Sequence, residues 1–238
     1  MLTLSGTEHQ QDRQTPRMYA TSPSDVLEAL RICARDEVKL LIHECGLEDY
    51  DHIHMLEDLS FWLMDTFVTY RLRVNDHETV EIETPVLLRP AKSEDVEGMG
   101  RLAAEAFAGF KGHFHNDLRL ERSKCDSMYV EWARNSYHDK SLADHVAVAE
   151  AGGSLVGFTT ARIRGGEVWQ IVLSSVRPDF QRRGIYEALV AYCINWAKSL
   201  DLKWMQGATN VDNYGVHGVC RRFGFNIFGS GHIFHKWF

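Results

Sequence analysis

Hydrophobic and polar positions recur along this chain with two different periods, which predict helices and strands in turn. Apolar residues three and four apart are typical of a helix with one face on a core, whereas alternation or short apolar runs are typical of strands. The helical period predicts helices at residues 24–36, 50–60, 93–107, 123–137, 184–200 and 213–225. Strands are predicted at residues 38–46, 61–74, 86–91, 144–163, 167–176 and 203–209, and in a last segment ending at Phe238.

Two of these segments indicate how the strands are arranged. Residues 144–163 alternate on either side of Gly152-Gly153, a strong signal for a hairpin. Residues 167–176 are apolar on both faces, which is typical of a central strand. The element order from residue 86 onward therefore predicts an α/β fold with a mixed central sheet flanked by helices.

The acidic segment 75–84 reads as a linker and divides the chain. Residues 1–19 are polar and are expected to form a loose tail rather than a signal peptide. Residues 20–85 then form an N-terminal unit, and residues 86–238 form the main domain.

Composition limits the functional classes. The 238 residues contain no apolar run near the ~20 residues of a membrane span, so no membrane association is expected. A net charge of -7 argues against a nucleic-acid partner. The five cysteines are odd in number and lack CxxC spacing, which favours reduced thiols in the cytoplasm over zinc or disulfides. The chain is therefore expected to be a cytoplasmic protein.

The stretch VRPDFQRRGIYEALV, residues 176–190, passes from a strand through a turn into a helix. A helix start presents several backbone N–H groups and about half a positive charge. Gly184 allows close approach to the backbone, and Arg182 and Arg183 add positive charge. The stretch predicts a cradle for a pyrophosphate. In the alternative interpretation, the arginines are solvated and Gly184 only tightens a turn.

This stretch, followed by the pattern N-x-x-V-x-x-x-C-x-x-x-G-F, resembles the GNAT superfamily of acyl-CoA-dependent N-acetyltransferases across residues 86–238. The resemblance implies acetyl-CoA, or another acyl-CoA, as co-substrate and no metal. It also implies that the strand before the turn splays from its neighbour and pairs with the pantetheine arm. The implied coenzyme-binding residues are Ser174, Ser175, Val176, Gln181, Arg182, Arg183, Gly184, Ile185, Tyr186, Glu187 and Asn213.

Two departures from the family pattern concern proton transfer. Cys220 stands where the family often has a tyrosine that protonates the leaving thiolate. A thiol pKa near ~8.5 makes the thiolate a tolerable leaving group, so activity does not require that tyrosine. Cys220 is the candidate acid, with water, Tyr214 or a purely structural Cys220 as alternatives. Gln170 replaces a frequent glutamate, which leaves His115 as the candidate base, with His113, Glu167 or a water chain as alternatives.

A finer resemblance, over residues 56–74, 102–136 and 194–213, is to the dTDP-fucosamine acetyltransferases, nucleotide-sugar enzymes within GNAT. It implies that residues 20–85 are a partial GNAT-like unit and that the acceptor is the amine of an amino-sugar nucleotide. The implied acceptor-binding residues are His113, Phe114, Tyr129, Trp132 and Asn135. Four nearby cations are expected to offset an acceptor diphosphate: Lys111, Arg119, Arg122 and Lys124.

Two other functions stay open at this level. One is an N-acetyltransferase for peptides or small amines, and the other is a non-catalytic acyl-CoA-binding module. The sequence also leaves open the acyl chain length and whether two copies form a homodimer.

Overall fold

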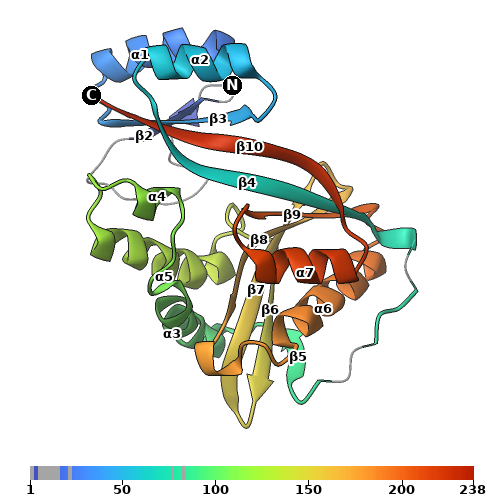
Figure 1. Cartoon of the computed structure of the whole chain (residues 1–238). Helices are drawn as coiled ribbons and strands as arrows, with labels where there is room; N and C mark the ends of the chain where they lie inside the picture. Colours follow the sequence, from blue (N-terminus) through green and yellow to red (C-terminus); the bar gives the residue numbers. More distant parts are fainter. Residues whose placement is uncertain (1–2, 5–16, 21–22, 77, 82–83) are drawn as a thin grey trace.

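The computed structural model describes residues 3–4, 17–20, 23–76, 78–81 and 84–238 (Figure 1). Most of the predicted tail, including residues 5–16, lies outside the described residues. The described strands are β1 (Thr3–Leu4), β2 (Arg17–Ala20), β3 (Leu40–Gly46), β4 (Trp62–Arg73), β5 (Leu87–Pro90), β6 (His145–Ala151), β7 (Ser154–Arg164), β8 (Val168–Val176), β9 (Trp204–Asn210) and β10 (Asn226–Trp237). The α-helices are α1 (Pro23–Arg35), α2 (Tyr50–Asp58), α3 (Val96–Phe107), α4 (His113–Asn116), α5 (Arg122–His138), α6 (Ile185–Ser199) and α7 (Tyr214–Arg222).

All described strands join one sheet in the order β1-β2-β3-β10-β4-β9-β8-β7-β6-β5. Helices α3 and α5 lie on one side of the long strands, and α6 and α7 lie on the other (Figure 1). Alternate residues of β6 explain this arrangement, because Val146 and Val148 pack with α3 and α5, whereas Ala147 and Ala149 pack with α6. The predicted mixed α/β fold is confirmed.

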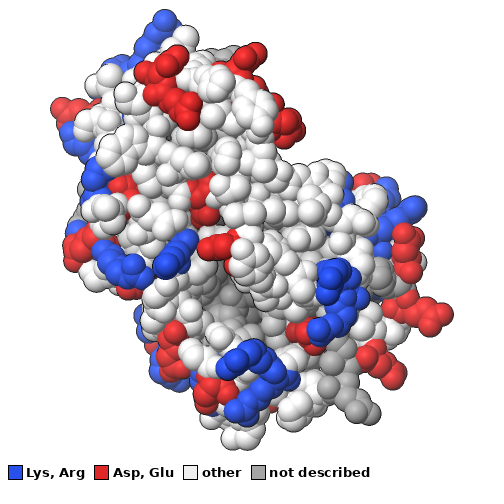
Figure 2. Space-filling view, in the orientation of Figure 1, with Lys and Arg blue, Asp and Glu red and all other residues white. Residues whose placement is uncertain are grey.

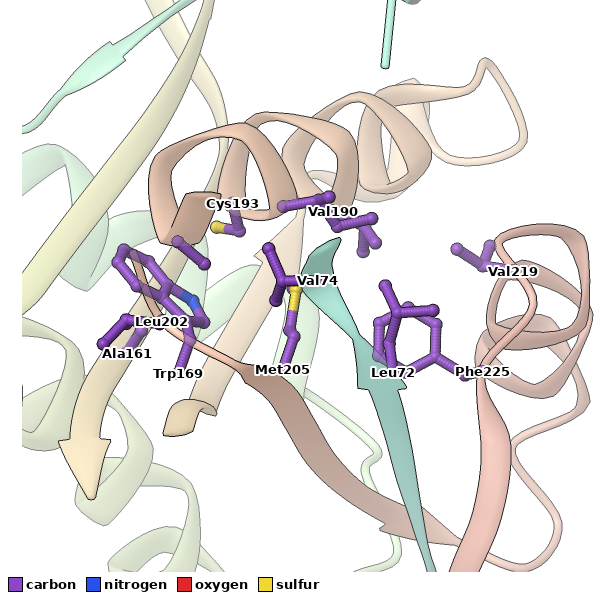
Figure 3. Close-up of a cluster of buried hydrophobic side chains, with 12 residues drawn as sticks. Leu72, Val74, Ala161, Trp169, Val190, Cys193, Leu202, Met205, Val219 and Phe225 are labelled. Atoms are coloured by element: carbon purple, nitrogen blue, oxygen red, sulfur yellow. The ribbon is translucent and has the colours of Figure 1, made fainter. Parts of the chain in front are cut away.

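A hydrophobic core joins α6 and α7 to the sheet (Figure 3). Trp169 of β8 and Met205 of β9 are almost completely buried there, against Cys193 on α6. Leu72 of β4 enters the same core from the N-terminal part of the chain. The core therefore fixes the turn between β8 and α6 relative to strands from both halves of the sequence.

Strand β4 lies between β9 and β10, although it precedes both by more than half of the chain. It pairs antiparallel with β9 from Phe67 to Arg73, and with β10 along its other edge. The predicted N-terminal unit and main domain consequently share one continuous sheet.

Strands β8 and β9 pair only where both begin. Their parallel pairing runs from Val168 opposite Trp204 to Gln170 opposite Gln206. Beyond these residues β8 continues to Val176 and β9 continues to Asn210. The two strands therefore splay apart as the family resemblance implied. Beyond Gln170, the edge of β8 that faces β9 no longer pairs with it.

Local predictions are mostly confirmed. The hairpin turns at Gly152 and Gly153, whose φ angles of 56° and 77° suit glycine. Three details differ from the expectation. Residues 113–116, where the sequence pattern predicted no helix, form α4, and Leu200, at the end of the predicted helix 184–200, is 41% exposed. Strand β2 pairs with β3 at the end of the segment that was predicted as a tail.

Candidate active site

A cavity of about 910 Å³ opens where β8 and β9 splay apart. One wall comes from β8, the turn after it, and the first turns of α6 and α7. The opposite wall comes from β3, β4, β10, the end of α3, α4 and α5. Figure 2 shows the corresponding hollow near the middle of this face, with charged side chains around its rim.

The turn between β8 and α6 has a backbone shaped for an anion. Arg182 and Gly184 have φ angles of 61° and 79°, in the left-handed region that a non-glycine residue such as Arg182 rarely adopts. Two left-handed residues so close together, followed directly by the helix start at Ile185, turn backbone N–H groups toward one side. A Cβ added to Gly184 would meet only the Glu187 carboxylate, at 3.8 Å.

Predicted coenzyme-binding residues gather on this wall. The cavity is lined by Ser174, Ser175, Val176, Gln181, Arg182, Gly184, Ile185, Tyr186, Glu187 and Asn213. Arg183 does not line it, and its guanidinium lies over the Phe180 ring at 5.1 Å. Glu187 is paired with Arg222, which offsets its charge. Tyr186 lines the cavity and also packs into the core, where burial raises the pKa of its phenol.

Asn213 links this wall to α7. Its side-chain oxygen caps the helix by accepting the Val216 N–H. Its Nδ2 donates to Thr209 Oγ1 at 2.9 Å, which ties the helix start to the end of β9. Gly224, with a φ of 73°, follows the end of this helix.

Aromatic rings form much of the opposite wall. Phe107 stacks on Tyr129 with ring centroids 4.4 Å apart, and Phe110 meets Tyr129 edge to face. Trp132 also lines the cavity, as does the predicted acceptor residue His113. The other predicted acceptor residues, Phe114 and Asn135, do not line it, and Phe114 is buried against β3.

Asp65 of β4 brings a carboxylate into this aromatic wall. Its oxygens accept hydrogen bonds from the Thr66 N–H at 2.8 Å and from Asn210 Nδ2 at 2.9 Å, and the His113 N–H also donates to it. Burial raises the pKa of Asp65 to about 6, so the carboxylate remains mostly ionised at neutral pH. Our sequence interpretation missed Asp65. The available signal was a single acid next to the apolar run that opens the predicted strand 61–74.

The two residues predicted as acid and base do not line the cavity. Cys220 packs against the core beside α6, and burial raises the pKa of its thiol to about 11. The His115 side chain is 0% exposed, and its Nε2 lies 3.1 Å from Asp126. Gln170 does line the cavity, and Arg164 donates to its side-chain oxygen at 2.8 Å. Glu167 pairs with Lys203 outside it.

Cations of the α4–α5 segment lie outside the cavity lining. Arg119 binds Asp117 at 3.0 Å, and Lys124 lies 3.3 Å from Glu121. Arg122 donates to the carbonyl of Phe110 at 3.4 Å. The acceptor wall itself is acidic, since Asp65 and Glu44 line it. Such a wall attracts a cationic group, and the opposite wall attracts an anionic one.

Comparison with known families agrees with this geometry. Residues 112–225 match the model of the Acetyltransferase (GNAT) family. They contain the turn, α6, β9 and α7, each of which contributes residues to the cavity lining. Through this segment the chain is similar to the GNAT acetyltransferases, and the similarity supports an acetyltransferase. Members of this family use acetyl-CoA as co-substrate.

Two curated relatives are similar over most of the chain. The spore coat polysaccharide biosynthesis protein SpsD of Bacillus subtilis is 25% identical over 204 residues, which are 85% of this chain and 68% of that protein. The uncharacterized N-acetyltransferase MJ1207 of Methanocaldococcus jannaschii is 25% identical over 182 residues, covering 74% of this chain and 75% of that protein. A GCN5-related N-acetyltransferase from Sphaerobacter thermophilus has the same fold, with a TM-score of 0.63 and 13% identity over 93% of this chain and 73% of that one.

Within the described ranges, no group of three or more His, Cys, Asp or Glu side chains is arranged to hold a metal ion. None of the helices in that part of the chain is both long and apolar enough to cross a membrane.

Proposed function

We propose that this protein transfers an acetyl group from acetyl-CoA to the primary amine of an amino sugar carried on a nucleotide diphosphate. One observation carries the proposal: a single cavity joins a turn with two left-handed residues and the unpaired edge of β8 to a wall of aromatic rings with a carboxylate. An acetyltransferase needs both halves in one continuous space, because the amine must reach the thioester carbonyl.

The coenzyme half follows from the backbone. The amides of Arg182 through Glu187 bind the pyrophosphate, and the left-handed φ of Gly184 supports this role. The edge of β8 at Ser174 to Val176, beyond its pairing with β9, binds the pantetheine arm through main-chain hydrogen bonds. Acetyl-CoA bound there supplies the thioester on which the amine acts.

The acceptor half follows from charge. An amine is mostly protonated at neutral pH, and the Asp65 carboxylate offers it a partner of opposite sign. Glu44 adds a second negative charge on the same wall. These two acids come from residues 20–85, so the proposed partial GNAT-like unit completes the acceptor site rather than forming a separate one.

An amino sugar fits the rest of this wall. Phe107, Phe110, Tyr129 and Trp132 offer apolar faces of the kind that pack against sugar rings. The similarity to a spore coat polysaccharide biosynthesis protein supports a sugar acceptor. Basic side chains lie on the α4–α5 side of the hollow in Figure 2, outside the acidic wall. The nucleotide diphosphate is therefore expected at the rim of the cavity, with the amine of the attached sugar directed inward.

An acceptor panel tests the proposal. Free thiol release from acetyl-CoA is measured with amino-sugar nucleotides, free amino sugars, polyamines and short peptides. We expect kcat/KM for the best amino-sugar nucleotide to exceed that of free amino sugars and peptides at least 10-fold. Nucleoside diphosphates should inhibit competitively with the acceptor.

Other results would redirect the assignment. Faster transfer to peptides, without inhibition by nucleoside diphosphates, would favour the peptide alternative. Tight acetyl-CoA binding without thiol release for any amine would favour the non-catalytic binding module.

A further inference from the structure

Three side chains behind the acceptor wall form a hydrogen-bonded chain that ends at the cavity. Asp117 Oδ2 lies 2.9 Å from Nδ1 of His235, and Nε2 of His235 lies 2.9 Å from Nδ1 of His113. Asp117 and His235 are 2% and 0% exposed, whereas His113 lines the cavity. The chain therefore connects a buried carboxylate to the space proposed for the amine.

Asp117 is held as an anion by several donors. Trp237 Nε1 donates to Oδ2 at 2.7 Å, and both the side-chain Nε and the backbone N–H of Arg119 donate to Oδ1, at 3.0 and 3.1 Å. Burial alone would raise the pKa of Asp117, but hydrogen bonds from His235, Arg119 and Trp237 hold it well below its usual range. Asp117 can therefore only accept hydrogen bonds.

This anion sets the proton positions in both imidazoles. An ionised carboxylate has no proton to give, so Nδ1 of His235 carries the proton between them. In neutral His235 the other nitrogen, Nε2, must then accept, and Nδ1 of His113 donates to it. Neutral His113 consequently has its lone pair on Nε2. The geometry thus selects the tautomer in which Nε2 of His113 is basic.

We propose that His113 is the general base that takes a proton from the acceptor amine through Nε2, with His235 and Asp117 as positioning residues behind it. This inference rests on the proposed function and names the base of that same site. The positive charge that develops on His113 is stabilised through His235 by the Asp117 anion. Asp65 keeps a separate role, which is to bind and orient the ammonium.

The proton and electron balance is complete without another reactant. The ammonium N–H bond breaks, its electron pair stays on nitrogen, and the proton bonds to Nε2 of His113. The nitrogen pair then bonds to the thioester carbon as the carbon–sulfur bond breaks with its pair on sulfur. A second proton from nitrogen converts the thiolate to coenzyme A thiol, and His113 releases its proton to solvent.

Kinetics of variants test the base directly. In His113→Ala, we expect kcat with a saturating amino-sugar acceptor to fall about 100-fold, as is typical for loss of a general base. Acetyl-CoA affinity measured by calorimetry should stay within about twofold. Added imidazole should raise the kcat of His113→Ala at least 10-fold. A kcat within threefold of the parent would overturn the proposal.

The positioning residues require a readout that instability alone would not change. Asp117→Asn and His235→Gln remove the stabilisation of the His113 cation, so the pKa of His113 falls. In a plot of kcat against pH, the acid limb should therefore move to lower pH by about one unit. An unmoved limb would overturn the positioning roles. Asp65 and Glu44 line the same cavity and Arg119 pairs with Asp117, and all three charged groups are kept in both variants.

A matched control uses a second histidine pair, which lies away from the cavity. His43 and His52 also contact through ring nitrogens 2.9 Å apart, and neither lines the cavity. His52→Gln removes a comparable hydrogen bond, and we expect kcat and the acid limb to stay unchanged.

Nitrogen NMR of the histidine rings provides a test that does not depend on turnover. In the parent near pH 8, we expect protonated Nδ1 and unprotonated Nε2 in both His113 and His235. The opposite tautomer of His113 would overturn the proposal. If the parent acetylates no amine, the proposed function fails and the assignment of a base fails with it. In that case NMR still decides whether the hydrogen-bonded chain exists.

Discussion

At the scale of single residues, Asp65 has the most informative environment in the acceptor wall. It is a carboxylate on a central strand of the sheet, partly removed from water, and it accepts hydrogen bonds from several N–H donors. Its raised pKa shows that burial outweighs those donors, because hydrogen bonds to a carboxylate act in the opposite direction. Such a group has a cost in stability that a binding role would explain.

Asp65→Asn should separate the stability cost of the Asp65 carboxylate from its proposed role in acceptor binding. The folded-state pKa of about 6 is above the usual value near 4, so ionised Asp65 destabilises the fold. This destabilisation is absent below pH 4, grows between pH 4 and 6, and is complete above pH 6. Because one pKa unit corresponds to about 1.4 kcal/mol, we expect urea unfolding to show a gain of about 2–3 kcal/mol for the variant at pH 7.5 and none at pH 4.

The same variant should bind its acceptor poorly. Loss of a charged partner for the ammonium is expected to raise the acceptor KM at least 10-fold at pH 7.5, with a smaller effect on kcat. Asp51→Asn, on the first turn of α2, is the control and should change neither quantity. An unchanged acceptor KM in Asp65→Asn would contradict the proposed ammonium contact.

At the scale of elements, the turn between β8 and α6 combines three features that the coenzyme requires. The strand leaves its neighbour at Gln170, the turn contains two left-handed residues, and the helix starts directly after Gly184. Each feature is common alone, but together they direct a free strand edge and several amides into the same cavity. The element, rather than any one side chain, makes the proposed coenzyme site.

Gly184→Glu tests this element. The variant brings a carboxylate to the proposed pyrophosphate site, and calorimetry should show acetyl-CoA affinity reduced at least 10-fold. Gly153→Glu is the matched control, because its φ of 77° is close to the 79° of Gly184 and a Cβ there meets no neighbour within 4 Å. Both variants should lose about 1 kcal/mol of stability from the left-handed backbone. Equal affinities in the two variants would argue against the pyrophosphate site.

At the scale of the whole molecule, one sheet unites the two halves of the sequence. Strand β4 pairs with β9 on one edge and β10 on the other, so its removal would expose two strand edges and part of the core around Leu72. The acceptor wall also depends on this strand, because β4 carries Asp65 and Phe67. Stability and acceptor binding are therefore coupled through the same element.

A fragment containing residues 86–238 should consequently fail to fold alone. We expect it to aggregate or to lack a cooperative thermal transition by circular dichroism, whereas the full chain should unfold in one transition. Co-expression with residues 1–85 should recover soluble protein, since β4 can pair without a covalent link. A fragment that unfolds cooperatively and binds acetyl-CoA would show that the two parts are independent domains.

The sequence by itself determined features that depend on neighbouring residues. The hairpin at Gly152-Gly153, the strand–turn–helix around Gly184 and the cap of α7 by Asn213 all follow from local backbone preferences. The same local pattern was enough to indicate similarity to the GNAT family, and most of the residues that it predicted for coenzyme binding line the cavity.

Only the tertiary structure decided what reaches the acceptor side of the cavity. Asp65 meets Asn210, and Asp117 meets His235, across more than a hundred residues of sequence. Hydrophobic periodicity determines which face of a strand is buried, but it carries no information about which strands become neighbours. The insertion of β4 between β9 and β10 made those neighbours, and it brought Asp65 to the wall that His113 also lines.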